Sequence, residues 1–99
     1  MEMPMPIKNQ FTIYSKSGCT YCIKVKKLLT DLQLVHTIID CDEYIKNKKD
    51  KELFLQFIHN ISYVNYTTFP MIFDGTIFVG GYSNVEPYLD KLLDFDTMF

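Results

Sequence analysis

Two cysteines separated by two residues, Cys19 and Cys22, are the residues of this chain whose type and spacing suit redox chemistry. Thiols at this spacing can close into a disulfide and open again, and the thiolate is the reactive form of cysteine. In the preceding segment, Phe11 to Ser15, apolar and polar residues alternate and β-branched residues are frequent, which predicts a strand. Residues 20–34 are predicted to form a helix. The pair is therefore expected at a helix N-terminus.

The two thiols are expected to have different roles. The unpaired N–H groups and the dipole of a helix N-terminus favour an anion, so Cys19, at the more exposed end, is predicted to be the nucleophile. Cys22 lies about one turn further along the same face, where it can attack a mixed disulfide formed at Cys19 and release the partner thiol. Lys16 adds positive charge close to the pair.

A structural zinc site and a structural disulfide are the alternative uses of such a pair. Zinc normally takes four ligands, and beyond the pair the chain offers Cys41, His36 and His59, with no second pair at zinc-finger spacing. A secreted disulfide scaffold would carry an even number of cysteines and an export signal, whereas this chain has 3 cysteines and no such signal. Redox chemistry in a reducing, cytoplasmic compartment fits the residues better. Cys41 is expected to fill apolar space at a strand end.

Composition limits the class of protein further. Of the 99 residues 47% are apolar, which is enough for one packed core, so residues 1–99 are expected to form a single domain with residues 1–9 as an extended or flexible leader. The formal net charge of −2 argues against nucleic acid as a partner, because such binding depends on neutralising phosphates. No apolar run of about 18 residues predicts a membrane-spanning helix, and no membrane partner is expected.

Periodicity and turn chemistry predict the remaining elements. They are a strand over 34–40, a helix after the lysine-rich segment 46–51, two strands over 71–73 and 76–79 around an Asp-Gly turn, and a last helix opened by a capping box at 83–86. The first helix has an apolar stripe of Val25, Leu28, Leu29 and Leu32, with which it is expected to pack on the sheet. The apolar residues expected to face the core from the last two helices are Leu53, Phe54, Phe57, Ile58, Ile61, Val85, Tyr88, Leu89, Leu92 and Leu93.

Four segments of the chain resemble the glutaredoxin family. They are residues 14–22 (YSKSGCTYC), 68–70 (TFP), 71–75 (MIFDG) and 80–84 (GGYSN), which together span most of the chain at the spacing of the family. Between Cys41 and Tyr66 the resemblance is limited to a helical pattern. It implies an α/β, thioredoxin-like fold, with a four-stranded mixed β-sheet flanked by about three to four α-helices.

The resemblance also implies an activity, that of a glutathione-dependent thiol–disulfide oxidoreductase, or thioltransferase. Cys19 would take glutathione from a mixed disulfide, and Cys22 would resolve disulfides of proteins. Glutathione would be the co-substrate, and glutathionylated or disulfide-containing proteins would be the substrates. A monomer without a metal is the expected form.

A set of groove residues would contact glutathione if the resemblance holds. Phe69 would pair its backbone with the cysteinyl unit, held by a cis peptide bond before Pro70. Lys16 would meet the glycyl carboxylate, while Ser83 and Asn84 would hold the γ-glutamyl carboxylate at a helix N-terminus, which is a natural anion site. The further expected contacts are Tyr21 and Tyr82 as walls of the groove, together with Thr68 and Gly81.

Two related functions stay open at this point. Some glutaredoxins without an active-site proline, where this chain has Thr20, bridge a [2Fe–2S] cluster between two protomers through the nucleophilic cysteine and bound glutathione. The other is the function of a glutaredoxin-like redoxin that is reduced by thioredoxin reductase. The presence of Lys16 and Tyr21 favours glutathione over that reductase as the electron source. Thioredoxin itself usually has tryptophan beside its cysteines, and this chain has no tryptophan.

Overall fold

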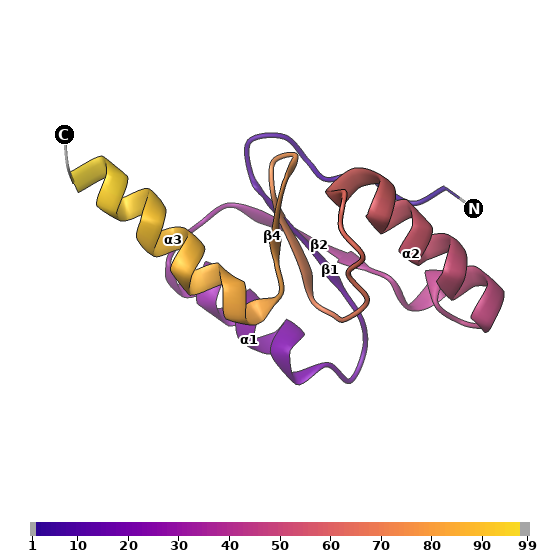
Figure 1. Ribbon diagram of the computed structural model, residues 1–99. Helices are drawn as coiled ribbons and strands as arrows, with labels where there is room; N and C mark the ends of the chain where they lie inside the picture. The colour runs from indigo at the N-terminus through magenta and orange to yellow at the C-terminus, as the bar shows by residue number, and fades with distance from the viewer. Residues whose placement is uncertain (1, 98–99) are drawn as a thin grey trace.

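The computed structural model describes residues 2–97, and the burial of side chains up to residue 92. Its elements, in chain order, are β1 (Phe11–Ser15), α1 (Thr20–Asp31), β2 (His36–Asp40), the 3-10 helix η1 (Asp42–Tyr44), α2 (Lys48–Ser62), β3 (Met71–Asp74), β4 (Ile77–Gly80) and α3 (Tyr82–Thr97) (Figure 1). None of the helices in this part of the chain is long and apolar enough to cross a membrane.

The sheet has four strands in the order β2-β1-β3-β4, which confirms the predicted mixed sheet. The strands β1 and β2 are parallel, with α1 as their connection, whereas β3 is antiparallel to both β1 and β4. The predicted hairpin between β3 and β4 is present, and Gly75 adopts the left-handed φ of +58° that its turn requires. The central position of β1 holds the loop that follows it close to both halves of the sheet.

The first helix is shorter than its apolar pattern predicts. It ends at Asp31, and Gln33 takes a left-handed φ of +57°. The N–H groups of Leu32 and Leu34 donate to the carbonyl groups of Leu28 and Leu29, which closes the helix before the next strand begins. The strand predicted over 34–40 therefore starts at His36.

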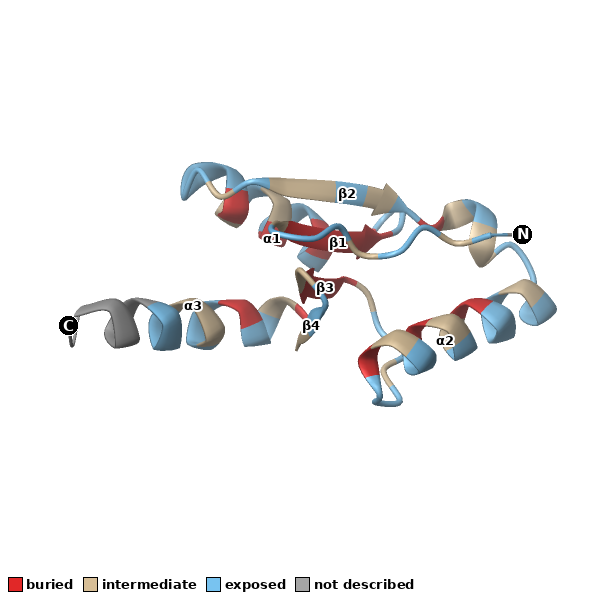
Figure 2. Ribbon diagram, turned by 90° about the horizontal axis from the view of Figure 1, so that it is seen from above, coloured by how far each residue is buried: buried red, intermediate tan, exposed pale blue. Residues whose placement is uncertain are grey.

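Side-chain alternation along β1 divides the core between the two faces of the sheet. Phe11 and Ile13 pack on one face, whereas Tyr14 packs on the other. The first face is covered by α1 and α3 and the second by α2, so the buried residues concentrate on the central strands and on one line of each helix (Figure 2). The buried residues of the first cluster are Phe11, Ile13, Val25, Leu29, Ile72 and Val85, and those of the second are Tyr14, Cys41, Phe54, Ile58, Met71 and Phe73.

Three residues predicted to face the core are about half exposed. Leu32, the C-cap residue of α1, is 51% exposed because the helix ends just before it. Leu53 is 49% exposed, because α2 buries the line of Phe54 and Ile58 and turns the preceding position outward. Leu92 is 44% exposed, because α3 extends beyond the edge of the sheet (Figure 2). Leu93 lies outside the residues whose side chains are described.

The last helix begins earlier than the predicted capping box. It starts at Tyr82, so Ser83 lies inside the first turn and Pro87 lies inside the helix. The side chain of Asn84 reaches back, and its Oδ1 accepts the N–H of Gly81 at 3.0 Å. This contact satisfies a backbone donor just before the helix, which is the physical role expected of a cap.

The N-terminal segment runs along the sheet without regular structure. The Tyr14 hydroxyl donates to the Pro4 carbonyl at 2.6 Å, and the Ile7 N–H donates to Thr12 Oγ1 at 2.9 Å. Met3 is half-buried against the cluster that contains Tyr14. The segment therefore contacts the face of the sheet that α2 covers.

Candidate active site

The cysteine pair lies at the start of α1, where the sequence predicts it. Cys19 is the N-cap residue, with an extended backbone, and its Sγ accepts the N–H of Cys22 at 3.2 Å. The two cysteines form a disulfide, and their Cα atoms are 5.2 Å apart. Cys19 is 8% exposed and Cys22 is fully buried, so an incoming thiol or disulfide reaches Cys19 first.

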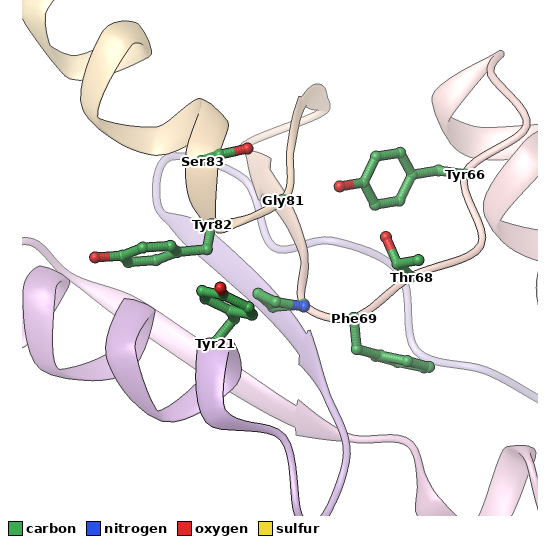
Figure 3. Close-up of a pocket in the computed structure, with 8 residues that line it drawn as sticks. Tyr21, Tyr66, Thr68, Phe69, Gly81, Tyr82 and Ser83 are labelled. Atoms are coloured by element: carbon green, nitrogen blue, oxygen red, sulfur yellow. The ribbon is translucent and has the colours of Figure 1, made fainter.

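A groove of about 560 Å³ lies beside the first turn of α1 (Figure 3). Its walls come from the start of α1, the segment before β3 and the start of α3, three regions far apart in the sequence. The residues that line it are Tyr21, Tyr66, Thr68, Phe69, Pro70, Gly81, Tyr82 and Ser83. All the predicted glutathione contacts except Lys16 and Asn84 are in this set.

The peptide bond between Phe69 and Pro70 is cis, as predicted. Pro70 is buried, and the ring of Phe69 stacks on Phe54 with centroids 5.7 Å apart and an interplanar angle of 12°. Phe54 stacks in turn on Tyr44, with centroids 6.1 Å apart. The Phe69 ring is thus attached to the core on the α2 side, while the residue itself lines the groove.

Two tyrosines form one wall of the groove. The rings of Tyr21 and Tyr82 stack with centroids 5.5 Å apart, and Figure 3 shows them on the side opposite Tyr66 and Thr68. The Lys24 ammonium lies 5.2 Å from the centroid of the Tyr21 ring, a cation–π contact. This wall joins α1 to α3 next to the cysteines.

The opposite wall contains Tyr66, which the sequence does not predict as a groove residue. Its ring packs edge-on against Phe78 with centroids 5.1 Å apart, and its hydroxyl lies so close to Gly81 that a methyl group on Gly81 would overlap it. Glycine at position 81 therefore lets the two walls approach each other. The only hint of this role in the sequence is that an aromatic residue stands two positions before the Thr-Phe-Pro segment. A single aromatic residue forms no periodic pattern, so it does not predict a position in the groove.

Lys16 and Asn84 lie at the margins of the groove. Lys16 lines a neighbouring hollow of about 270 Å³ that shares Thr68 and Phe69 with the groove, and its ammonium is 5.8 Å from the centroid of the Phe69 ring. Lys51 lines the same hollow. Asn84 does not line the groove, because its side chain is used in the contact with Gly81.

The third cysteine belongs to the core. Cys41 follows β2, is fully buried, and its Sγ donates to the Ile39 carbonyl at 3.5 Å. Burial raises the pKa of this thiol to about 12, so it stays protonated at neutral pH. Its position confirms the prediction that it fills apolar space at a strand end.

Each of the two histidines lies within hydrogen-bond distance of a backbone carbonyl group. His36 Nδ1 lies 2.8 Å from the Leu34 carbonyl oxygen, and His59 Nδ1 lies 3.2 Å from that of Val64. Within the described residues, no three side chains of the metal-binding types His, Cys, Asp and Glu gather into a group that could hold a metal ion.

Comparisons with known proteins agree on one family. The family model described as glutaredoxin matches residues 11–79. Glutaredoxin 1 of Rickettsia felis is 33% identical over 97 residues, which cover 93% of this chain and 88% of that protein. Glutaredoxin 1 of Rickettsia prowazekii is 31% identical over 97 residues, covering 93% and 95%.

Solved glutaredoxin structures share the fold. The buckwheat glutaredoxin–glutathione complex has a TM-score of 0.64 and 26% identity, and the match covers 84% of this chain and 71% of that one. Glutaredoxin 1 from Francisella tularensis, complexed with cacodylate, has a TM-score of 0.66 and 24% identity, covering 85% and 95%. The sheet and the helices on its two faces therefore have the thioredoxin-like arrangement predicted for this chain.

Proposed function

The chain belongs to the glutaredoxin family of thiol–disulfide oxidoreductases, and we propose that it uses glutathione as its reducing co-substrate. The observation that carries the proposal is the groove beside the first turn of α1, together with the neighbouring hollow that Lys16 lines. In this proposal residues 1–99 act as one domain and as a monomer, with residues 1–9 as the leader. The reducing cytosol predicted from the cysteine pattern is the compartment in which this chemistry runs in the direction of reduction.

Glutathione is an extended tripeptide with a carboxylate near each end, and the groove offers a match for each part. The exposed Lys16 is the cation for the glycyl carboxylate. The backbone of Phe69, before the cis-proline, is the partner for the cysteinyl unit. At the other end, the first turn of α3 presents N–H groups that lack intrahelical partners, which suits the γ-glutamyl carboxylate near Ser83.

The other lining residues have supporting roles in this proposal. Tyr21 and Tyr82 form an apolar wall along the peptide, with Thr68 and Gly81 opposite and beneath it. Asn84 acts through the helix start, because its side chain accepts the Gly81 N–H and so orders the turn that presents the free N–H groups.

The reaction with a glutathionylated substrate needs only Cys19. Its thiolate attacks the glutathione sulfur of the mixed disulfide, the old S–S bond breaks, and the substrate leaves as a thiolate that takes a proton. The helix N-terminus stabilises the Cys19 thiolate before the attack. A second glutathione thiolate then attacks the glutathione sulfur bound to Cys19, releasing oxidised glutathione and returning the Cys19 thiolate.

Protein disulfides need both cysteines. Cys19 attacks one sulfur of the substrate disulfide and forms a mixed disulfide with the protein, while the other substrate sulfur leaves as a thiol. Cys22 then attacks Cys19, and the second substrate thiol leaves, which produces the internal disulfide seen in the structure. Two glutathione molecules reduce this disulfide, supplying the two electrons and ending as oxidised glutathione.

The test compares cysteine variants on the mixed disulfide of glutathione and 2-hydroxyethanethiol, coupled to glutathione reductase. We expect Cys19→Ser to abolish turnover and Cys22→Ser to retain it, because the second cysteine serves only dithiol substrates. Cys41→Ala is the matched control, since that thiol is buried away from the groove, and we expect it to turn over at the wild-type rate.

Three results would contradict the proposal. Full activity of Cys19→Ser would refute the nucleophile. Turnover with thioredoxin reductase as electron source, but not with glutathione, would refute the co-substrate. A brown dimer after anaerobic reconstitution with iron and sulfide would refute the metal-free monomer.

A further inference from the structure

The segment that follows β2 runs beside the loop that carries Cys19. Ser15 and Asp40 are register partners at the ends of β1 and β2, and the Cys41 N–H donates to the Ser15 carbonyl at 2.8 Å. The next residue, Asp42, begins η1. The pairing of the two strands therefore continues past the end of the sheet and brings Asp42 next to the loop Lys16–Gly18.

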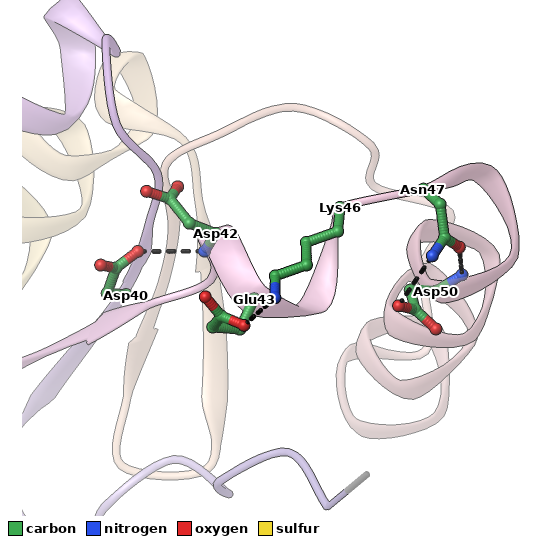
Figure 4. Close-up of polar contacts among 6 residues, drawn as sticks. All are labelled: Asp40, Asp42, Glu43, Lys46, Asn47 and Asp50. Carbon is green, nitrogen blue, oxygen red and sulfur yellow. Dashed lines mark hydrogen bonds and ion pairs between the residues drawn. The ribbon is translucent and has the colours of Figure 1, made fainter.

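Asp42 holds that loop through both oxygens of its carboxylate. Oδ1 accepts the Ser17 N–H at 2.9 Å, and Oδ2 accepts the Ser17 hydroxyl. The backbone N–H of Asp42 donates to Asp40 Oδ1 at 3.0 Å, and this bond helps to fix the orientation of Asp42 (Figure 4). These bonds join two segments that are 25 positions apart in the sequence.

The carboxylate has no competing partner on its own helix. The nearby cation Lys46 pairs instead with Glu43, 2.5 Å between Nζ and Oε2, and the Asp42 side chain points away from that pair (Figure 4). The hydrogen bonds from Ser17, aided by the charge of Lys16, lower the pKa of the Asp42 carboxyl. The carboxylate is therefore ionised at neutral pH, when its two acceptor oxygens are both available.

The loop has few other means of keeping its shape. Lys16, Ser17 and Gly18 are all exposed. Gly18 has a left-handed φ of +66°, and no atom lies within 4 Å of the position that a Cβ would take there, so no packing contact holds this conformation. Among the described residues, no other side chain forms a hydrogen bond with positions 16–18. Ser17 is two residues before Cys19, so a shift of Ser17 is transmitted to the thiol through one glycine.

We propose that Asp42 is a positioning residue for the reaction at Cys19, because its carboxylate fixes the loop Lys16–Gly18 and thereby keeps Cys19 at the N-cap of α1. The same contact keeps Lys16 at the edge of the groove. The inference rests on the proposed role of Cys19 as nucleophile. It assigns to Asp42 no contact with the substrate.

Geometry and charge act on Cys19 in opposite directions, which makes the idea testable. A neighbouring negative charge disfavours a thiolate, so loss of the charge alone would lower the pKa of the Cys19 thiol or leave it unchanged. Loss of the N-cap position removes the helix N–H groups that stabilise the thiolate, so a disordered loop would raise that pKa. Asp42→Asn removes the charge and keeps an acceptor for the Ser17 N–H, whereas Asp42→Ala removes both.

The experiment measures two quantities on the reduced protein in a Cys22→Ser background, where Cys19 is the reactive thiol. One is the thiol pKa, taken from the pH dependence of alkylation by iodoacetamide, and the other is kcat/KM with the glutathione mixed disulfide. We expect Asp42→Ala to raise the thiol pKa and to lower kcat/KM by roughly ten- to a hundredfold, the size of effect that a small misplacement of a reacting group produces. Asp42→Asn should restore most of both, and Ser17→Ala, which removes one of the two bonds, should fall between them.

Asp31→Ala is the control, because it removes an acidic residue whose exposed ion pair with Lys27 lies at the far end of α1. We expect it to match the parent protein in both quantities. Parent-like alkylation and turnover in both Asp42→Ala and Ser17→Ala would overturn the proposal. So would an Asp42→Asn protein that reacts as slowly as Asp42→Ala, since a retained acceptor for the Ser17 N–H would then restore nothing. The alkylation profile reads Cys19 directly, so failure of glutathione turnover in every protein would refute the co-substrate without deciding this inference.

Discussion

Replacement of Phe54 by alanine should destabilise the protein strongly, whereas the same change at its neighbour Leu53 should not. Phe54 is fully buried and its ring contacts four other aromatic rings, those of Tyr14, Tyr44, Phe57 and Phe69. Leu53 precedes it on α2 and is 49% exposed. The two positions are equally apolar in the sequence, so the pair tests the structure directly.

The size of the effect follows from the burial. A buried Phe→Ala change costs about 3–5 kcal/mol, because the transfer energy of the ring is lost and a cavity remains. The four ring contacts of Phe54 place it in the upper part of that range, about 4–5 kcal/mol, which is a large share of the roughly 5–15 kcal/mol that a domain has in total. For a chain of this length about 4 kcal/mol corresponds to a fall in Tm of roughly 15–30 °C. Leu53→Ala should cost about 1 kcal/mol or less, since half of that side chain is already in water.

The assay is urea unfolding followed by far-UV circular dichroism, with the cysteine pair kept oxidised in every sample. Phe54→Leu is included as a milder variant, expected to cost about 1–2 kcal/mol because it retains most of the apolar volume. Two results would refute the proposed packing of α2 on the sheet. One is a free energy of unfolding for Phe54→Ala within about 1 kcal/mol of the wild-type value. The other is a loss of stability in Leu53→Ala as large as that in Phe54→Ala.

Two further predictions concern the buried thiol of Cys41 and the half-buried side chain of Tyr88. At pH 8 iodoacetamide should modify the reduced Cys19 of the folded protein and leave Cys41 unmodified, because burial raises the pKa of Cys41 to about 12. Mass spectrometry of the peptides would show which cysteine is alkylated. Modification of Cys41 at the same rate as Cys19 without denaturant would refute the prediction. The Tyr88 hydroxyl donates to Asp74 Oδ2 at 2.5 Å, and burial followed by this bond raises its pKa to about 12. Because the folded pKa lies above the value of about 10 in the unfolded chain, the contribution of Tyr88 to stability is complete below about pH 10 and is lost as the pH rises through 12. Unfolding free energies measured between pH 8 and 11.5 should therefore fall less in Tyr88→Phe than in the exposed control Tyr63→Phe, and equal slopes would contradict the bond.

Much of this protein is determined by interactions between residues close together in the chain. The Cys-x-x-Cys pair at a helix N-terminus, the Asp-Gly hairpin and the buried line of Val25 and Leu29 each depend on local spacing and turn chemistry, and each is present in the structure. The cis bond before Pro70 was implied by resemblance to a family, and it too is confirmed.

The errors arise where a local pattern has more than one tertiary outcome. An apolar helical stripe is wider than the line that meets the sheet, so Leu53 and Leu92 turn outward although they fit the pattern. The start of α3 differs from the predicted capping box because Asn84, and not Ser83, supplies the side chain that reaches the unpaired backbone donor.

The groove and its supports were decided by the tertiary structure alone. Tyr66 meets Gly81, and Asp42 meets Ser17, because the strand order β2-β1-β3-β4 brings the ends of separate segments to one edge of the sheet. Local sequence determines which residues are reactive and which segments are helix or strand, since those properties depend on neighbours a few bonds away. Which side chains stand across from the thiol depends on how distant segments pack, and no local pattern carries that information.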